Sequence, residues 1–353
     1  MRILVINCGS ATLKYALFDG GPDRLDRLAS STVDWEGGYT ATVKRALAAL
    51  PLAPDVIAHR VVHGGERFVA PVTIDDEVVR HLAELVPLAP LHNAVALEGI
   101  AATRDMGVPL IAVFDTAFFA DLPDRARRYA MPSAPGLRRY GFHGWSHRFV
   151  TERCATLLGH PEPTLVSLHL GSGCSAAAIQ RGRPVDISMG YSPLEGLVMG
   201  TRPGDVDPGL LLHLVEQGAD AAALERLLHR ESGLQALAGS ADMRELLARD
   251  DTAAREAIEL FCYRIVKYVG AYLAALDGKA EALVFTGGIG SGSPEIRRRV
   301  CETMAWAGVR LEPERNAGGE ERISGPDGRL AVFALRSDEE GTIAREVARW
   351  LAG

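Results

Sequence analysis

A pattern of strand, small-residue turn and strand occurs twice in this chain, and it constrains the fold more than any other feature. Residues 2–7 (RILVIN) form a β-branched run that enters a Cys-Gly-Ser turn and resumes as a strand over 13–18. Residues 165–170 (LVSLHL) enter a Gly-Ser-Gly turn and resume over 174–179. A repeat of this kind favours a duplicated unit, although one shared pattern does not by itself establish a duplication.

The remaining signals mix strands with helices. Helical spacing is clearest over 252–276, where apolar residues recur every three or four positions. Residues 312–329 are polar and rich in glycine, so we expect a surface loop there. We also expect strands at 56–62, 110–114, 283–286 and 330–335, and helices at 76–86, after Pro294, and through Arg345 to Trp350. This mixture is typical of the α/β class, and 353 residues favour two domains.

Charge and cysteine content narrow the class of protein. A net charge of -7 and a pI near 5.8 argue against nucleic-acid binding, because no basic excess exists to neutralise phosphates. The five cysteines are scattered and form no CxxC pair, which favours a reducing, cytoplasmic location over a disulfide framework. The first residues read as a strand rather than a signal peptide, and no apolar run has membrane-spanning length, so we expect no membrane association.

Three turns of small residues follow three predicted strands, at 7–10, 171–173 and 287–290. Small residues let backbone N–H groups approach an anion closely, as a bound phosphate requires. The alternative is that the turns are tight connections without a ligand. Neither a Walker P-loop nor a GxGxxG motif is present, so any nucleotide site is of another type.

Two arginines stand beside these signals. Arg60 lies in a predicted strand, and Arg202 follows a Gly-Thr turn. A guanidinium binds phosphate or carboxylate through two hydrogen bonds and stays charged. The alternative for each arginine is an ordinary surface ion pair.

Histidines at 143 and 147 would share one face of a helix. A zinc site is a poor interpretation of this pair, because HExxH is not matched and no third ligand is evident. The alternative is a helix start with one capping and one buried histidine.

Carboxylates follow two of the predicted strands, at Asp115 and at the cluster 338–340 (DEE). Such oxygens suit Mg²⁺, which keeps several waters and binds few protein groups. Alternatively, Asp338 caps a helix whose first turn favours the two glutamates. Both interpretations can hold at once.

The chain resembles the acetate kinase family in a series of motifs that occur in the family's order. The opening signature is matched at 4–14 (LVINCGSATLK), and the second at 59–66 (HRVVHGGE). Further matches are 90–93 (PLHN), 114–118 (FDTAF), 140–144 (YGFHG) with 146–147 (SH), 169–171 (HLG), 192–196 (SPLEG), 199–202 (MGTR), 232–234 (SGL) and 285–290 (FTGGIG). Together they span residues 3–345 and are far more specific than any single glycine turn.

The resemblance implies an α/β fold made of two domains with a duplicated ribonuclease-H-like core, the type shared by sugar kinases, Hsp70 and actin. It implies an N-terminal domain of residues 1–116 with 340–353, a C-terminal nucleotide-binding and dimerisation domain of 117–339, and nucleotide binding between them. It further implies a homodimer that transfers a phosphoryl group directly, without a phosphoenzyme, between ATP and acetate to give ADP and acetyl phosphate.

The resemblance also assigns catalytic and metal-binding roles. Arg60 and Arg202 would grip the carboxylate and the transferred phosphoryl group. His143 would donate a hydrogen bond to the transition state, and Asp115 would orient the reacting groups. Mg²⁺, for which Mn²⁺ could substitute, would be held by Asn7 and Glu339.

The substrate contacts implied by the resemblance fall into two groups. The methyl group of the acid would lie in an apolar pocket formed by Val62, Leu91, Phe142 and Pro193. The nucleotide would contact Lys14, His169, Gly171, Ser172, Gly173, Gly288 and Gly290.

The chain departs from the family pattern at several positions near these motifs. Ser172 stands where the family has asparagine, Ser291 where it has glutamate, and Trp145 where it has threonine. Phe119 replaces a histidine and Asp338 an asparagine, and the chain is shorter than typical members, mostly between 14 and 59.

Three alternatives to acetate kinase remain open from the sequence. The acid could be longer, such as propionate, because one methylene contributes only about 1–3 kcal/mol of discrimination. Ser172 and Ser291 leave room for pyrophosphate or another phosphoryl donor. A catalytically silent nucleotide-binding protein would be expected to lack some of the catalytic set, which is present here.

Overall fold

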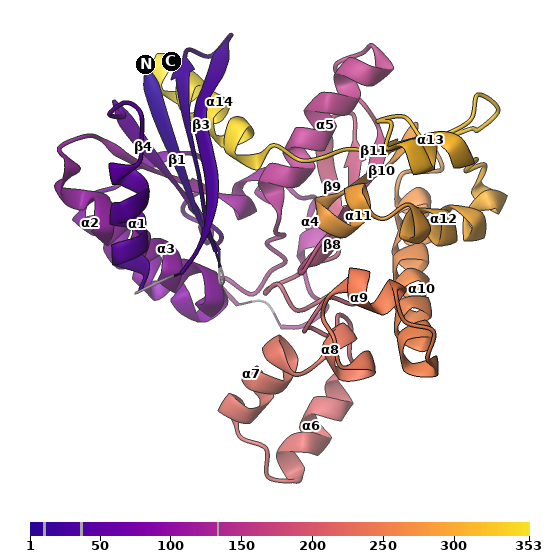
Figure 1. The fold of residues 1–353 in the computed structure, drawn as a ribbon. Helices are drawn as coiled ribbons and strands as arrows, with labels where there is room; N and C mark the ends of the chain where they lie inside the picture. The colour runs from indigo at the N-terminus through magenta and orange to yellow at the C-terminus, as the bar shows by residue number, and fades with distance from the viewer. Residues whose placement is uncertain (10–11, 36–37, 133) are drawn as a thin grey trace. The chain divides into compact units, whose positions relative to one another are not determined.

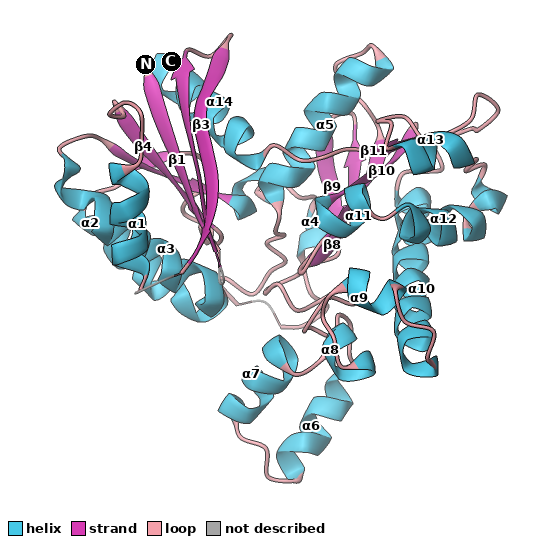
Figure 2. Ribbon diagram, in the orientation of Figure 1, coloured by secondary structure: helices cyan, strands magenta, loops and turns pink. Residues whose placement is uncertain are grey.

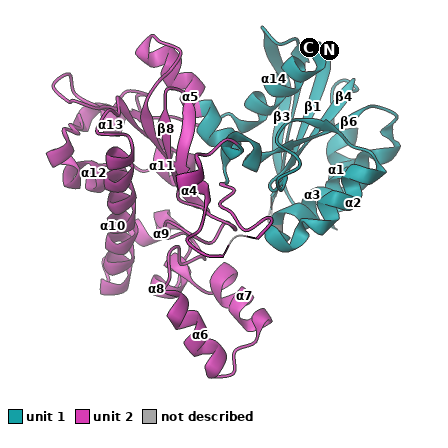
Figure 3. Ribbon diagram, turned by 180° about the vertical axis from the view of Figure 1, so that it is seen from behind, with its two compact units in different colours: residues 1–120, 142–149, 338–353 teal, residues 121–141, 150–337 magenta. Residues whose placement is uncertain are grey.

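The structure is a computed structural model that describes residues 1–9, 12–35, 38–132 and 134–353, apart from the side chain of Leu91. Its contacts divide the chain into two compact units (Figure 3). Unit 1 comprises residues 1–120, 142–149 and 338–353, and unit 2 comprises residues 121–141 and 150–337. The functional domain limits expected from the sequence, at 116/117 and 339/340, stay a prediction.

Unit 1 is built on a mixed sheet with the strand order β3-β2-β1-β4-β6-β5. Strands β1, β2 and β3 are antiparallel neighbours, whereas β1, β4 and β6 run parallel. Short strand β5 pairs antiparallel with β6 at the edge. The strands are β1 (Arg2–Cys8), β2 (Thr12–Gly20), β3 (Leu25–Asp34), β4 (Val56–Val61), β5 (Val72–Thr73) and β6 (Leu110–Phe114).

Alternating side chains on the buried strands of unit 1 supply two apolar cores. In β1, Leu4 and Ile6 face one core, while Ile3 and Val5 face the other, as the period of two in a strand requires. Helices α1 (Tyr39–Ala48), α2 (Asp76–Glu84) and α3 (Pro90–Thr103) cover the first face, and α14 (Glu339–Ala352) covers the second (Figure 1). The C-terminal helix therefore packs directly on the N-terminal strand.

Short helices complete unit 1, and α5 begins in it. The 3₁₀ turns are η1 (Val86–Leu88), η2 (Arg104–Met106) and η3 (Asp115–Phe119). Helix α5 (Gly144–Leu158) starts in unit 1 and continues into unit 2.

Unit 2 contains a sheet with the strand order β11-β10-β7-β8-β9. Strands β7, β8 and β9 are antiparallel neighbours, and β7, β10 and β11 run parallel. Written from the other edge, as β9-β8-β7-β10-β11, this order has the same strand orientations as β3-β2-β1-β4-β6 in unit 1, so the duplication indicated by the repeated turn is confirmed. The strands are β7 (Leu165–Leu170), β8 (Cys174–Gln180), β9 (Arg183–Ile187), β10 (Ala282–Thr286) and β11 (Ala331–Ala334).

Some helices of unit 2 pack on its sheet, whereas α6 (Pro208–Glu216) and α7 (Ala221–Arg230) project away from it (Figure 2). The longest is α10 (Thr252–Ala275), which Asp251 caps by accepting a hydrogen bond from the Ala254 N–H. The others are α4 (Asp124–Arg127), α8 (Gly233–Ala238), α9 (Met243–Leu247), α11 (Gly287–Gly292), α12 (Pro294–Thr303), η4 (Ala305–Ala307) and α13 (Pro313–Gly318). Among the helices of the described residues, none is long and apolar enough to cross a membrane.

Helix α13 corrects one expectation, because the sequence predicted a loop over 312–329. Pro313 occupies the first turn of the helix, where its missing N–H costs nothing. Asn316 is buried and accepts a hydrogen bond from Arg297 Nε at 2.7 Å, which anchors the helix on α12. A single buried side chain thus orders a segment whose composition is typical of loops.

Candidate functional site

Arg60 forms the centre of a polar cluster in unit 1. Strand β4 pairs with β6 so that Val61 lies beside Phe114, which brings Arg60 next to Asp115 at the strand ends. Arg60 Nε donates to Asp115 Oδ1 at 2.7 Å and Arg60 Nη2 donates to Oδ2 at 2.6 Å. Because the Asp115 carboxylate is almost fully buried, this bidentate pair fixes the plane of the guanidinium.

The remaining terminal nitrogen of Arg60 contacts two further oxygens. Arg60 Nη1 donates to Asn7 Oδ1 at 3.0 Å and lies 3.3 Å from Glu339 Oε2. Asn7 is the last residue but one of strand β1, Glu339 begins helix α14 and Asp115 follows strand β6, so three elements converge on one guanidinium. Burial alone would lower the pKa of Arg60, but the carboxylates of Asp115 and Glu339 outweigh it and raise the pKa above its usual value.

Glu340 belongs to the same cluster, although the sequence did not single it out. Asn7 Nδ2 donates to Glu340 Oε1 at 2.9 Å, which directs the amide oxygen of Asn7 toward Arg60. Asp338 caps helix α14 by accepting a hydrogen bond from the Gly341 N–H at 3.0 Å, so the capping interpretation is confirmed. The signal for Glu340 was present in the DEE run, but only the fold shows which glutamate meets Asn7.

The oxygens around Arg60 fit a magnesium ion. Asn7 Oδ1 and Glu339 Oε2 both lie close to Arg60 Nη1, and three carboxylates face one guanidinium, which leaves an excess of negative charge. Mg²⁺ takes few protein ligands and keeps its waters, so two such oxygens suffice. Among the described residues, no group of three or more His, Cys, Asp and Glu side chains could hold a metal ion.

His143 lies immediately before helix α5 with an unusual backbone. Its φ is 58°, a left-handed conformation that costs free energy in a non-glycine residue. The next residue lies against the Asp115 backbone: a Cβ on Gly144 would be 1.9 Å from the Asp115 carbonyl oxygen, so only glycine fits there. His147 is buried against the Phe119 ring at 5.8 Å between centroids, as the alternative interpretation of the histidine pair expected.

The other expected ligands of unit 1 lie on several elements. Val62 is 9% exposed after β4, and Phe142 is buried with its ring 5.7 Å from that of His63. Lys14 is exposed on β2, directly opposite Asn7 in the antiparallel register. Leu91 begins helix α3, but its side chain lies outside the described part of the structure.

Two glycine turns of unit 2 lie at the same end of its sheet. His169 pairs with Thr286 in the parallel register of β7 and β10, so the turns that follow these residues are neighbours. A Cβ on Gly287, whose φ is +76°, would lie 2.5 Å from the Leu170 carbonyl oxygen, so only glycine fits. A Cβ on Gly171 would lie 3.8 Å from His169 Nε2 and 3.9 Å from the Gly288 nitrogen, which shows how closely these groups converge.

A large cavity adjoins these turns. Its empty volume is about 1380 Å³, including space open to solvent, which is ample for a nucleotide. Of the expected nucleotide contacts, Gly171, Ser172 and Gly288 line it; Gly173 follows in the turn, and Gly290 is buried beneath it. The lining also includes Ala241, Asp242, Met243, Arg244, Leu247, Ile289, Gly292, Ser293, Pro294 and Glu295.

Helix α9 contributes a wall of this cavity that the sequence analysis missed. Asp242 caps the helix and pairs with Arg244 at 2.5 Å, and Arg244 remains largely exposed. Asp242, just before the helix, is a residue type that favours helix capping and could have been noticed in the sequence, but nothing around it indicates a nucleotide site. Its place at the cavity depends on the fold.

Arg202 differs from Arg60 because no carboxylate among the described residues pairs with it. Arg202 Nη1 donates to the Pro193 carbonyl oxygen at 2.7 Å, which fixes one end of the fork. Burial lowers the pKa of Arg202 to about 10, and the nearby Cys174 only weakly opposes this. The segment that carries Pro193 is anchored by Glu195, which accepts hydrogen bonds from Tyr129 Oη at 2.6 Å and Arg139 Nη2 at 2.7 Å.

Comparison with known proteins gives one consistent result. The model of the acetokinase family matches residues 39–345. The acetate kinase of Symbiobacterium thermophilum is 43% identical over 394 aligned residues, which cover 99% of this chain and 98% of that protein. The match thus extends over both units.

Solved structures show the same similarity. A propionate kinase from Francisella tularensis has a TM-score of 0.90 at 34% identity, with 98% of each chain covered. The acetate kinase of Porphyromonas gingivalis has a TM-score of 0.88 at 36% identity, with 99% of each chain covered. A candidate N-acetylmannosamine kinase from Listeria monocytogenes, 12% identical with a TM-score of 0.51, shares the fold alone. These similarities confirm the predicted fold class.

Proposed function

The chain belongs to the acetokinase family, and we propose that it transfers a phosphoryl group reversibly between ATP and acetate. Family membership makes it a kinase, an enzyme of the phosphotransferase class. In the proposed reaction an acetate oxygen attacks the γ-phosphorus, the bond from that phosphorus to the ADP oxygen breaks, and acetyl phosphate and ADP leave. The transfer is direct and in line, without a phosphoenzyme.

The observation that carries this proposal is the uncompensated charge of Arg202. A buried guanidinium without a carboxylate partner is costly unless an anion arrives to pair with it. Arg202 is influenced electrostatically by Cys174, which itself follows the glycine turn at the nucleotide-sized cavity. A phosphoryl group in transfer carries charge on three equatorial oxygens, and the planar fork of an arginine can meet two of them.

Arg60, Asp115 and His143 complete the proposed catalytic set. Asp115 would act by holding Arg60, because both of its carboxylate oxygens are taken up by the guanidinium. Arg60 would bind the carboxylate of the acid through its remaining hydrogens. His143, fixed against the backbone of Asp115, would donate a hydrogen bond to the developing charge.

Mg²⁺ would be held by Asn7 and Glu339, with waters and phosphate oxygens completing its shell. When bound, it would neutralise charge on the nucleotide phosphates. The nucleotide would occupy the cavity lined by Gly171, Ser172 and Gly288, and its phosphates would also contact Lys14 and His169.

A slightly longer acid is the second candidate, because the similar Francisella tularensis enzyme is a propionate kinase. Val62, Phe142 and Pro193 would contact the methyl end of the acid, and small differences among such side chains distinguish acetate from propionate by only about 1–3 kcal/mol. The proposal also includes a cytoplasmic location and a homodimer, in keeping with five free buried cysteines and with exposed apolar side chains on α6.

A hydroxamate assay tests the proposal most directly. Purified protein is incubated with acetate, propionate or butyrate, and with ATP or pyrophosphate, with and without excess chelator. We expect acyl phosphate from acetate and ATP, and none when divalent metal is removed. Activity only with pyrophosphate would show that pyrophosphate, and not ATP, is the phosphoryl donor. Full activity in excess chelator would show that the reaction needs no divalent metal. ADP binding without transfer from any donor would identify a silent relative.

A further inference from the structure

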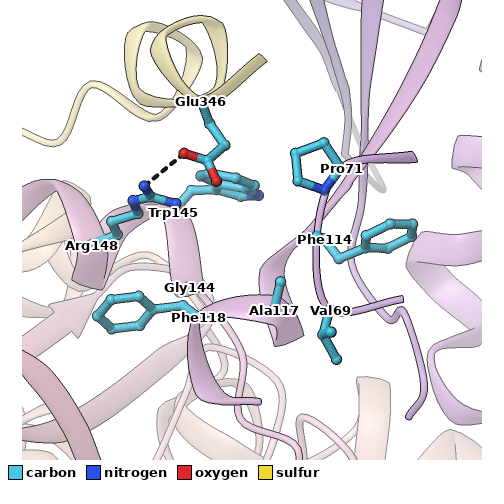
Figure 4. A pocket seen from close by; sticks show the side chains of 10 residues that line it. Val69, Pro71, Phe114, Ala117, Phe118, Gly144, Trp145, Arg148 and Glu346 are labelled. Atoms are coloured by element: carbon cyan, nitrogen blue, oxygen red, sulfur yellow. Dashed lines mark hydrogen bonds and ion pairs between the residues drawn. The ribbon is translucent and has the colours of Figure 1, made fainter. Parts of the chain in front are cut away.

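Unit 1 contains a small cavity that the proposed reaction does not use. It has an empty volume of about 360 Å³, part of which is open to solvent. Its walls are mostly apolar and come from the segment around β5, from η3, and from helices α5 and α14. Figure 4 shows Val69, Pro71, Phe114 and Ala117 along one side and Trp145, Arg148 and Glu346 along another.

Trp145 gives this cavity an unsatisfied hydrogen-bond donor. The side chain is 4% exposed, and its indole N–H has no acceptor among the described residues. In Figure 4 the indole nitrogen lies at the end of the ring that faces Pro71, on the cavity side. A buried donor without a partner costs about 1–3 kcal/mol, so a bound acceptor would be stabilised here.

Glu346 places an acceptor beside this donor. Its Oε2 accepts a hydrogen bond from Arg148 Nη2 at 2.6 Å, whereas its Oε1 makes no hydrogen bond with the described residues. The Glu346 side chain is 21% exposed and lines the same cavity as Trp145 (Figure 4). Arg148 and Glu346 are the two charged residues that line the cavity, and they pair with each other, while Arg349 Nη1 lies 4.0 Å from Glu346 Oε2 but is not part of the lining. The lining therefore carries no net charge and favours an uncharged ligand over an anion.

We propose that this cavity binds a small uncharged molecule that carries adjoining hydrogen-bond acceptor and donor groups, of which a primary amide is the simplest. Its carbonyl oxygen accepts from the Trp145 N–H, its amide hydrogen donates to Glu346 Oε1, and its apolar end contacts Val69, Pro71 and Phe114.

The cavity lies against three segments that begin at or next to residues of the candidate site. Its walls include η3, which begins at Asp115, and α5, which begins directly after His143. They also include α14, which begins at Glu339. A ligand here would contact the three segments that carry these residues.

Nuclear magnetic resonance of the full chain labelled with ¹⁵N-tryptophan tests the proposal. The four tryptophans give four indole signals, and Trp145→Phe identifies the one from Trp145. The probes are propionamide and its isomer N,N-dimethylformamide, which has the same carbonyl acceptor but lacks an N–H. No nucleotide or acid is added, so the result does not depend on the proposed reaction.

We expect propionamide to shift the Trp145 signal saturably while the other three signals stay constant. The isomer should bind about tenfold more weakly, because it has no N–H to donate to Glu346 Oε1. Glu346→Gln should narrow this difference, and ¹³C-labelled Val69 methyls report binding independently of the indole. The proposal would be overturned if the Trp145 signal moved no more than the other three signals. It would also be overturned if the indole N–H bonded only to water and its signal responded to neither probe. Both outcomes are measured on the parent protein, so neither depends on the folding of a variant.

Discussion

Arg202 combines burial with an unpaired positive charge, which is a costly arrangement for an empty protein. Burial lowers its pKa to about 10, so the folded chain holds this proton less tightly than the unfolded chain does. Between about pH 10 and 12.5 the unfolded state binds more protons than the folded state, so the free energy of unfolding rises with pH in that range. At neutral pH, below this range, the charged Arg202 therefore destabilises the fold. A residue retained at such a cost is expected to act on a ligand.

Arg202→Lys should keep the fold but lower kcat by about 10²-fold or more, as the loss of a preorganised donor does. Lysine retains the charge but loses the planar fork that meets two phosphoryl oxygens. The measurement is kcat for acetyl phosphate formation, together with calorimetric binding of ADP, which should change little. Turnover equal to that of the parent enzyme would show that Arg202 is not catalytic.

Gly288→Ala tests the nucleotide cavity at the level of one methyl group. A Cβ at this position meets no atom within 4 Å, and the backbone is not left-handed, so the fold should be unaffected. The added methyl group would occupy space beside the glycine turn at 287–290, where we propose that a phosphate lies. We therefore expect ADP affinity to fall about tenfold or more. Gly270→Ala in α10 is the matched control, since it also meets open space. Equal ADP affinity in both variants would place the nucleotide elsewhere.

The residues with a distinctive type and motif could be predicted from sequence, whereas those that act through geometry could not. Arg60 and Asp115 were both expected from their motifs, but only the register of β4 and β6 shows that they form one bidentate pair. Arg244 carries no motif signal of its own, and the DEE run does not tell which of its two glutamates meets Asn7. The roles of all these side chains stay predictions until the variants are measured.

At the scale of elements, the contact between β4 and α3 depends on a buried histidine. His59 Nε2 lies 2.9 Å from Thr103 Oγ1, whose own hydrogen is directed to the carbonyl oxygens of Gly99 and Ile100. His59 Nε2 is therefore the donor, and the ring is neutral. Burial lowers the pKa of His59 to about 3 from its ordinary 6.5.

This contact should make the protein sensitive to acid. Because the unfolded chain takes up the His59 proton below pH 6.5 and the folded chain does not until about pH 3, folding is disfavoured as the pH falls through this range. The expected loss is about 1.4 kcal/mol per pH unit from this one group. His59→Gln keeps a donor for Thr103 and cannot titrate, so urea unfolding at a series of pH values should show a shallower slope. Parallel slopes for the two proteins would exclude His59 as the source.

Element prediction succeeded where periodicity was strong and failed where tertiary contacts decide. The buried strands of both sheets and helix α10 were expected close to their observed bounds. Helix α3 was not, because its apolar residues are spread around the helix and give no clear stripe. Helix α13 was mistaken for a loop for a related reason, since a buried asparagine rather than an apolar face holds it.

In the whole molecule the same strand order occurs in both units, which explains why the repeated strand, turn and strand pattern in the sequence predicted the fold. In each copy the parallel strands end on the same side of the sheet, and each unit carries its own polar or glycine-rich segments at those strand ends. Unit 1 presents carboxylates and Arg60 there, whereas unit 2 presents glycine turns. The duplication therefore gives two sheets with the same strand order, and the different residues at their strand ends give each unit its own kind of polar site.

The exposed apolar side chains of unit 2 lead to the prediction about assembly. Helix α6 buries none of its residues among the described part of the chain, and Leu210, Leu212 and Val215 are 51%, 66% and 50% exposed. Apolar surface of this kind is typical of contacts with a partner. We expect a homodimer in sedimentation equilibrium, and we expect Leu212→Glu to shift it toward monomer, because burying an unpaired carboxylate at an interface is costly. Leu52→Glu, at a 48% exposed leucine of unit 1, is the matched control and should leave the dimer intact. A parent protein that sediments as a monomer at every concentration would refute the dimer, whereas dissociation by both variants alike would move the interface away from α6.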